Sequence, residues 1–167
     1  RSEWGTVVKP AEIEKALSEN PDARFVFSTH TDTSTSIACD IKGYGAAAAK
    51  TKAILIVDAI SGLGGQELLM DDWKCDVVIS ASQKCLMYAP ELGFISASQK
   101  AWPAIEQAKS PRFYWDLRTT AKSFPNGETP YTPAISLIRA TNVSLKMIRK
   151  KTLPVVWQET KELAKFT

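Results

Sequence analysis

The chain has 167 residues, of which 44% are hydrophobic and 23% are charged, and its formal net charge is +3. This composition predicts a globular unit with a continuous core and excludes the class of intrinsically disordered chains. The small net charge and the lack of an arginine-rich stripe give no sign of a nucleic-acid partner. No apolar run reaches the roughly 20 residues that span a bilayer, and no signal peptide is recognisable, so we expect no membrane association.

The cysteines and the single histidine limit metal and disulfide chemistry. Cys39, Cys75 and Cys85 form no CxxC pair, which argues against a zinc ribbon or a disulfide framework and favours a reducing compartment. One histidine does not make a multi-histidine site, so no metal site is predicted. We expect a cytoplasmic protein, with the peroxisome or the mitochondrion as alternatives for a eukaryotic source.

Apolar patterning in chain order predicts strands that alternate with helices. Short apolar runs predict four strands, at residues 24–29, 53–57, 76–80 and 92–96. Helices are predicted from Pro10, around 44–51, after a Ser98 cap, from Thr132-Pro133 and from Pro154. Residues 110–130 carry turn signals and aromatic residues, and Pro125-Asn126-Gly127 is the clearest turn. This alternation predicts an α/β fold with a mostly parallel sheet.

Polar residues follow three of the predicted strands. The first strand leads into His30 and the hydroxyl-rich stretch 31–36, the second into Asp58, and the third into Gln83-Lys84. Ligands of parallel sheets bind beyond the carboxyl ends of the strands. A carboxylate and an amine that end two apolar strands are costly to place there unless both find partners.

Asp58 and Lys84 have both ordinary and functional explanations. A helix cap accounts for Asp58, and a solvated side chain accounts for Lys84, from local sequence alone. The functional interpretation is a lysine that forms a Schiff base with pyridoxal 5′-phosphate (PLP), with a carboxylate that keeps the pyridine nitrogen protonated. Their separation, 84 − 58 = 26 residues, suits one strand–helix–strand crossover but identifies no enzyme by itself.

Longer motifs narrow the choice. Residues 57–65 (VDAISGLGG) and 70–84 (MDDWKCDVVISASQK) resemble class V, fold type I PLP-dependent aminotransferases, closest to alanine–glyoxylate and serine–glyoxylate (serine–pyruvate) aminotransferases. Residues 29–36, 112–117 and 129–138 are similar to the same group, in the same order. The resemblance implies a three-layer α/β/α large domain, a PLP cofactor, amino-acid and 2-oxo-acid substrates, and a homodimer.

The resemblance also implies roles for individual residues. Lys84 corresponds to the catalytic lysine that binds the cofactor aldehyde, and Asp58 to the carboxylate on the pyridine nitrogen. Thr33 falls where a hydroxyl lies near the ring oxygen of the cofactor, and Gln83 where a side chain contacts the phosphate. His30 falls beside the cofactor pocket, where a supporting role and a purely structural role both stay open.

A second segment is implied to act across the dimer. The stretch from Thr129 to Thr132 resembles the one that reaches the phosphate of the neighbouring subunit. Which of Thr129, Tyr131 and Thr132 makes that contact stays open. Some residues depart from the family pattern: Ser36 and Glu91 stand where glycine is usual, Asp32 replaces a glutamate and Ala81 a glycine. These departures leave substrate choice open.

We therefore expect residues 1–153 to be the central and later part of a PLP-binding large domain whose N-terminal part is missing. Residues 154–167 are expected to be a helix that leads toward a small C-terminal domain. The predicted reaction transfers an amino group from alanine or serine to glyoxylate or pyruvate, and the isolated chain is expected to be inactive. Cysteine desulfurase-like chemistry and a non-catalytic scaffold are the alternatives. Cys85 is interpreted as core packing, because the desulfurase cysteine lies on a separate loop.

Overall fold

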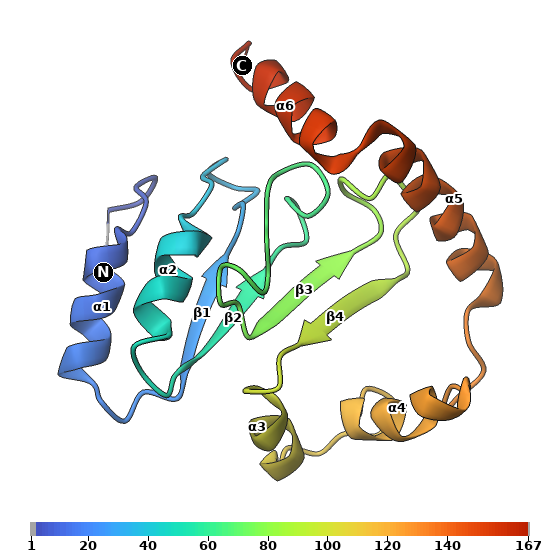
Figure 1. Cartoon of the computed structure of the whole chain (residues 1–167), viewed down its shortest axis with the longest axis horizontal. Coiled ribbons are helices and arrows are strands. Elements are labelled where there is room, and N and C mark those ends of the chain that lie inside the picture. The colour runs from blue at the N-terminus through green and yellow to red at the C-terminus, as the bar shows by residue number, and fades with distance from the viewer. Residues whose placement is uncertain (1–2, 167) are drawn as a thin grey trace.

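The computed structural model describes residues 3–166. In the first half of the chain its elements are α1 (Pro10–Glu19), β1 (Phe25–Thr29), α2 (Ile41–Ala48), β2 (Ile54–Asp58) and β3 (Val77–Ala81). The second half contains β4 (Gly93–Ala97), α3 (Trp102–Gln107), α4 (Leu117–Ser123), the 3-10 turn η1 (Phe124–Asn126), α5 (Ile135–Lys151) and α6 (Leu153–Leu163) (Figure 1).

The four strands form one sheet in the order β1-β2-β3-β4. The first three strands are parallel, and β4 is antiparallel to β3. Parallel neighbours need a long crossover connection, usually a helix, between them. Residues 82–92, which join β3 to β4, contain no helix, and the chain returns antiparallel. Each predicted strand is confirmed to within one residue at either end, and so is the mostly parallel sheet.

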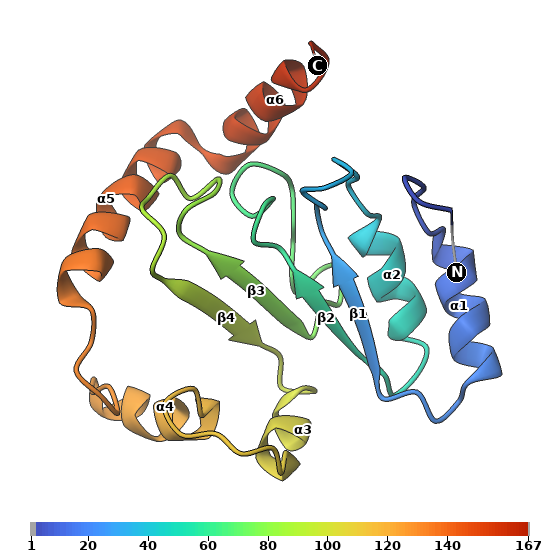
Figure 2. The ribbon, with the colours of Figure 1, turned by 180° about the vertical axis from the view of Figure 1, so that it is seen from behind.

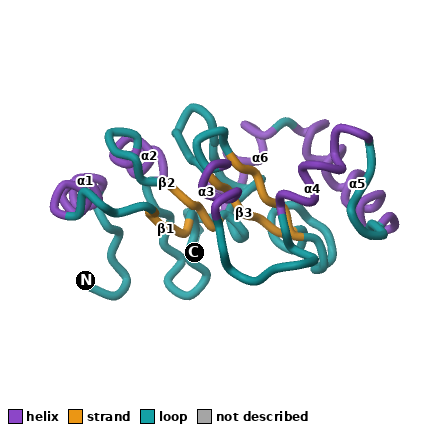
Figure 3. Tube along the Cα trace, turned by 90° about the horizontal axis from the view of Figure 1, so that it is seen from below, coloured by secondary structure: helices purple, strands orange, loops and turns teal. Residues whose placement is uncertain are grey.

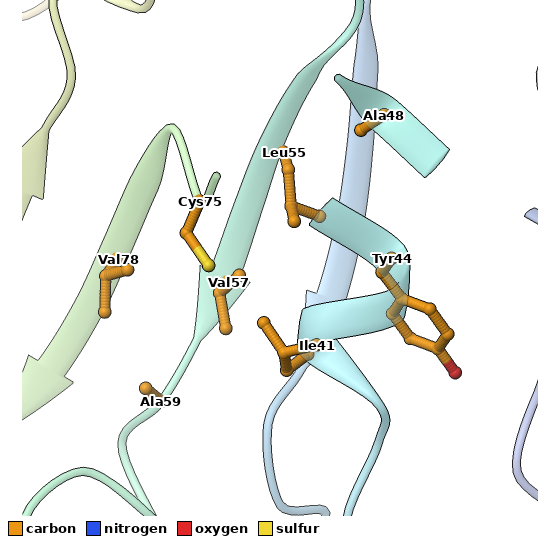
Figure 4. Close-up of a cluster of buried hydrophobic side chains, with 8 residues drawn as sticks. All are labelled: Ile41, Tyr44, Ala48, Leu55, Val57, Ala59, Cys75 and Val78. Atoms are coloured by element: carbon orange, nitrogen blue, oxygen red, sulfur yellow. The ribbon is translucent and has the colours of Figure 1, made fainter. Parts of the chain in front are cut away.

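The core lies between α2 and one face of the sheet. Ile41, Tyr44 and Ala48 of α2 pack on alternate residues of β2, among them Leu55 and Val57 (Figure 4). Helix α1 lies beside α2 in all three views (Figures 1, 2 and 3). These contacts bury one face of β2, as its fully apolar sequence predicts.

The opposite face of the sheet packs on α3. Ala101, at the N-cap of α3, is buried with Ile54 of β2 and Val77 of β3. The sheet therefore lies between helices on both faces, as the three-layer prediction requires (Figure 2).

Helix α2 begins three residues earlier than predicted because Asp40 caps it. The Asp40 carboxylate accepts a hydrogen bond from the Gly43 amide at 2.8 Å. Gly45 lets α2 approach the segment between β2 and β3, since a Cβ built there would lie only 1.7 Å from the Trp73 carbonyl oxygen.

The second half of the chain differs from the sequence-based expectations at two helices, α3 and α4. Ser98 does not cap α3, whose N-cap is Ala101; the Ser98 hydroxyl instead accepts from the Ala101 amide in the preceding turn, at 3.3 Å. Helix α4 lies within the stretch 110–130, where the sequence shows turn signals and aromatic residues. It forms because Asp116 caps it, accepting from the Arg118 amide at 3.1 Å, and also binds the Arg118 guanidinium.

Helices α5 and α6 leave the sheet and run past β4 toward the carboxyl ends of the parallel strands (Figure 1). Both were predicted, and α6 carries Pro154 in its first turn. They meet at Thr152, whose φ of 72° breaks the helical path between them. Among the described residues, no helix is both long enough and apolar enough to cross a membrane.

Candidate active site

The parallel register brings the ends of three strands to one level. Thr29 pairs with Asp58, and Asp58 pairs with Ile79, so β1, β2 and β3 end at the same edge of the sheet. The loops that follow them lie together at that edge (Figures 1 and 2). This edge, formed by residues 30–37, 59–66 and 82–92, is called the carboxyl edge below.

Asp58 presents a partly free carboxylate at the carboxyl edge. Its backbone is fixed, because its carbonyl oxygen accepts from the His30 amide at 2.7 Å. Its Oδ1 accepts from the Ile60 amide at 2.9 Å, so the ordinary turn-forming role is partly realised. The second carboxylate oxygen has no hydrogen bond or ion pair with any described residue, and the side chain is exposed. One oxygen is thus left for a ligand.

Lys84 and Gln83 are both exposed in the loop after β3. The loop is held at its base by Ser82, which is fully buried and donates to the Ala89 carbonyl oxygen at 2.6 Å. No described residue forms a hydrogen bond or an ion pair with the Lys84 ammonium group. The chain therefore fixes the main chain near Lys84 and leaves the amine unpaired.

Thr33 and Thr31 connect the loop after β1 to the turn after β2. The Thr33 hydroxyl lies 2.9 Å from the Ser61 hydroxyl. The Thr31 hydroxyl donates to the Gln66 side-chain oxygen at 2.8 Å. Thr33 thus lies against the turn that begins at Asp58, on the same edge.

His30 is buried, with 4% of its surface exposed. Burial lowers the pKa of His30, and a hydrogen bond with the Glu67 backbone offsets this only in part. Its Nδ1 has no hydrogen-bond partner among the described residues. Gly62 leaves room for the ring, since a Cβ built there would lie 2.6 Å from Nδ1. The ring is therefore neutral near pH 7 and lines the inner side of the carboxyl edge.

The segment from Thr129 to Thr132 is not at this edge. It lies between α4 and α5, away from the loops that follow the parallel strands (Figures 1 and 2). Thr129 donates to the Tyr131 carbonyl oxygen at 2.7 Å, and the Tyr131 ring stacks on Tyr114 with centroids 4.8 Å apart. Within one chain, Thr129, Tyr131 and Thr132 do not join Lys84 and Asp58, so their expected contact across a dimer stays a prediction.

Sequence reasoning gave no role to Ser61 in this site. The Ser61 carbonyl oxygen accepts a hydrogen bond from the Cys85 thiol at 3.2 Å, and its hydroxyl contacts Thr33. The one signal in the sequence is the Gly64-Gly65 pair within the 57–65 motif, which marks a turn that another segment approaches closely.

The side chains at the carboxyl edge fit the chemistry of PLP. An unpaired amine suits the cofactor aldehyde, and a carboxylate with a free oxygen suits a protonated pyridine nitrogen. The Thr33 hydroxyl lies in the loop after β1, and the Gln83 amide lies in the loop after β3. Among the described residues, no group of three or more His, Cys, Asp or Glu side chains is placed to hold a metal ion.

Comparison with known proteins assigns the chain and its fold to a family. Residues 3–167 match the sequence model of the aminotransferase class-V family. The chain therefore belongs to the class-V aminotransferases, and the predicted family and fold class are confirmed.

Individual relatives and solved structures match nearly the whole chain. The small subunit of a soluble hydrogenase from Synechococcus sp. is 34% identical over 98% of the chain and 44% of its own length. A serine–glyoxylate aminotransferase from Methylorubrum extorquens is 34% identical over 99% of the chain and 43% of its own length. The crystal structure of pyridoxamine–pyruvate aminotransferase from Mesorhizobium loti superposes with a TM-score of 0.83 and 26% identity, over 94% of the chain and 41% of that protein. The chain thus spans less than half the length of these relatives.

Two departures from the family pattern coincide with unusual backbone geometry. Ser36 and Glu91, which stand where the resemblance places glycine, have φ values of 57° and 131°. Side chains disfavour both conformations, whereas glycine adopts them readily. Both residues thus adopt a backbone conformation that favours glycine.

Replacing Glu91 with glycine should therefore stabilise the protein. Relief of backbone strain is worth about 1–3 kcal/mol, less about 0.5–1 kcal/mol for the greater freedom of glycine in the unfolded chain. The exposed Glu91 side chain has no hydrogen bond or ion pair with a described residue that would be lost. Urea unfolding measures the change, with Ala89→Gly as the matched control, which should destabilise. A Glu91→Gly variant no more stable than the wild type would contradict the strain.

Burial of His30 predicts a pH dependence of stability. Its pKa in the folded protein lies below the ordinary value of about 6.5, so the unfolded chain binds the proton more readily. Above about pH 6.5, His30 leaves the free energy of unfolding unchanged. As the pH falls through that value toward the pKa of folded His30, its contribution lowers the free energy of unfolding. Urea titrations between about pH 7.5 and pH 5 should show a steeper loss in the wild type than in His30→Gln. Identical slopes would show that His30 is not the group responsible.

Proposed function

We propose that this chain forms part of a PLP-dependent transaminase that moves an amino group from alanine or serine to glyoxylate or pyruvate. The observation that carries the proposal is the pair formed by Asp58 and Lys84. Asp58 is the last residue of β2 and Lys84 lies in the loop that follows β3. Both are exposed, and each retains a functional group without a partner among the described residues. Membership of the class-V aminotransferases supports this chemistry.

The residues of the carboxyl edge would divide the work of holding PLP. Lys84 would bind the aldehyde carbon, Asp58 the pyridine nitrogen and Gln83 the phosphate. Thr33 would lie near the ring oxygen, and neutral His30 would line the inner wall of the pocket. Bound PLP supplies an electron sink for the carbanion that forms at the substrate α carbon.

The side chains of this chain would then handle the protons. The Asp58 carboxylate would hold a proton on the pyridine nitrogen, which allows the ring to withdraw electrons. The Lys84 amine, once released by the incoming amino acid, would take the proton from the substrate α carbon as a general base. To act as a base the amine must carry no proton.

The proposal extends to the assembly. Residues 1–153 would belong to the large domain and 154–167 to a helix that leads to a small domain. One of Thr129, Tyr131 and Thr132 would reach the phosphate bound by the second subunit of a homodimer. Two facts support this arrangement: the relatives are more than twice as long as the chain, and the segment lies away from its own carboxyl edge.

Desulfurase-like chemistry has less support from the geometry. It would need a free cysteine thiol as the nucleophile, whereas the Cys85 thiol is half-buried and directed at the Ser61 carbonyl oxygen. A scaffold without chemistry would bind no cofactor at Lys84. The experiment below separates these possibilities.

The test is reduction with borohydride in the presence of PLP, followed by peptide mass mapping, on the protein that carries this sequence. The label should appear on Lys84 in the wild type, in Asp58→Asn and in the control Lys52→Ala, and not in Lys84→Ala. Lys52 is an exposed lysine at the opposite, amino end of β2. Absence of the label from Lys84 in the wild type would favour the scaffold.

Turnover with alanine or serine and glyoxylate completes the same experiment. Asp58→Asn should lower kcat by on the order of 100-fold while retaining the label, because the amide no longer holds the pyridine proton. Asp22→Asn, an exposed aspartate at the amino end of β1, is the matched control and should leave kcat unchanged. Normal turnover in Asp58→Asn would refute its assigned role, and release of sulfur from cysteine would favour the desulfurase alternative.

A further inference from the structure

Two side chains without an assigned role connect the loops of the carboxyl edge. The Cys85 thiol donates to the Ser61 carbonyl oxygen at 3.2 Å, and the Ser61 hydroxyl lies 2.9 Å from that of Thr33. Cys85 follows Lys84 directly, and Ser61 comes three residues after Asp58. These contacts join the loop that carries the amine to the turn that follows the carboxylate.

The turn after β2 is shaped to receive Cys85. A Cβ built on Gly65 would lie 2.5 Å from the Cys85 sulfur, closer than non-bonded atoms approach. At Gly64, with φ of 95°, a Cβ would lie 3.0 Å from the Leu86 side chain, which is buried. Cys85 and Leu86 therefore both dock on a surface that the two glycines leave open.

The main chain of Lys84 is thereby held on both sides. Before it, Ser82 is buried and its carbonyl oxygen accepts from the Tyr88 amide at 3.0 Å. After it, Cys85 is held by Ser61 and Gly65. The lysine side chain itself is exposed and has no hydrogen-bond or ion-pair partner among the described residues.

We propose that Cys85 and Ser61 are positioning residues that hold the Lys84 loop at a fixed place relative to Asp58. The proposal rests on the proposed role of Lys84 as the PLP-binding lysine. A displacement of about 1 Å at a reacting group can cost on the order of 100-fold in rate. Fixing the Lys84 main chain limits such displacement and still allows the long side chain to move between cofactor and substrate.

Packing alone also explains a half-buried cysteine, and the two explanations differ in one respect. Serine keeps a donor at position 85 at nearly the same size, whereas alanine removes the donor. If the thiol only fills space, the polar serine is no better than alanine at position 85. If the hydrogen bond to the Ser61 carbonyl positions the loop, serine restores what alanine loses.

The experiment compares Cys85→Ala, Cys85→Ser and Gly65→Ala, the last of which drives a methyl group against the sulfur. Thr51→Ala is the matched control, since its hydroxyl donates to the Ala48 carbonyl oxygen at 3.0 Å at the opposite end of β2. The readouts are kcat, KM for the amino acid, and the rate of borohydride labelling of Lys84 at limiting PLP. Circular-dichroism melting identifies any variant that fails to fold.

Cys85→Ala and Gly65→Ala should lower kcat and the labelling rate about tenfold with KM unchanged, and Cys85→Ser should stay within about twofold of the wild type. Thr51→Ala should match the wild type. The positioning role is overturned if Cys85→Ala matches the wild type, or if serine does no better than alanine, while wild-type Lys84 is still labelled. No label on wild-type Lys84 overturns the proposed function itself. If Cys85→Ala does not fold, the comparison of Gly65→Ala with Cys85→Ser decides the outcome.

Discussion

The parallel pairing of β1, β2 and β3 is the constraint on which the site depends. Thr29 and Asp58, which end β1 and β2, are in register with Ile79, and β3 ends two residues further on at Ala81. The three loops that follow must therefore share one edge of the sheet. The strand before Asp58 is nearly all buried, which fixes the backbone of that residue to the core. Side chains that are far apart in the sequence thereby become neighbours, and contacts such as Thr33 with Ser61 and Cys85 with Ser61 then connect the loops.

The amino edge of the same sheet holds a buried carboxylate that is fully paired within the fold. Asp76, which precedes β3, is buried and accepts from the Leu55 amide, the Ser98 hydroxyl and the Lys100 amine at 2.9–3.0 Å. These bonds tie β2 and β3 to the segment that follows β4. At the carboxyl edge Asp58 has only a local turn contact and Lys84 has no partner among the described residues. The charged group at the amino edge is therefore paired within the fold, whereas the charged groups at the carboxyl edge remain available to a ligand.

The sequence was sufficient for the features that depend on local patterning. The strands follow from apolar runs, and α6 follows from Pro154, because burial and proline geometry act over a few residues. Helix α4 was not predicted, because the Asp116 cap is surrounded by turn signals and aromatic residues. The motifs singled out Lys84 and Asp58, which the structure places in the loop after β3 and at the end of β2. No pattern encodes the contact between Cys85 and Ser61, which depends on how two turns pack in space. The positive φ of Glu91 was likewise not predicted. The sequence showed only that Glu91 stands where the family usually has glycine.

The central claim is that Asp58 and Lys84 serve one PLP ring. A crystal structure of the protein soaked with PLP tests it most directly. The account predicts continuous density from the Lys84 amine to the aldehyde carbon, with the free oxygen of the Asp58 carboxylate within hydrogen-bond distance of the pyridine nitrogen. A ring bound elsewhere, or bound to Lys84 with Asp58 on another side of the protein, would contradict it.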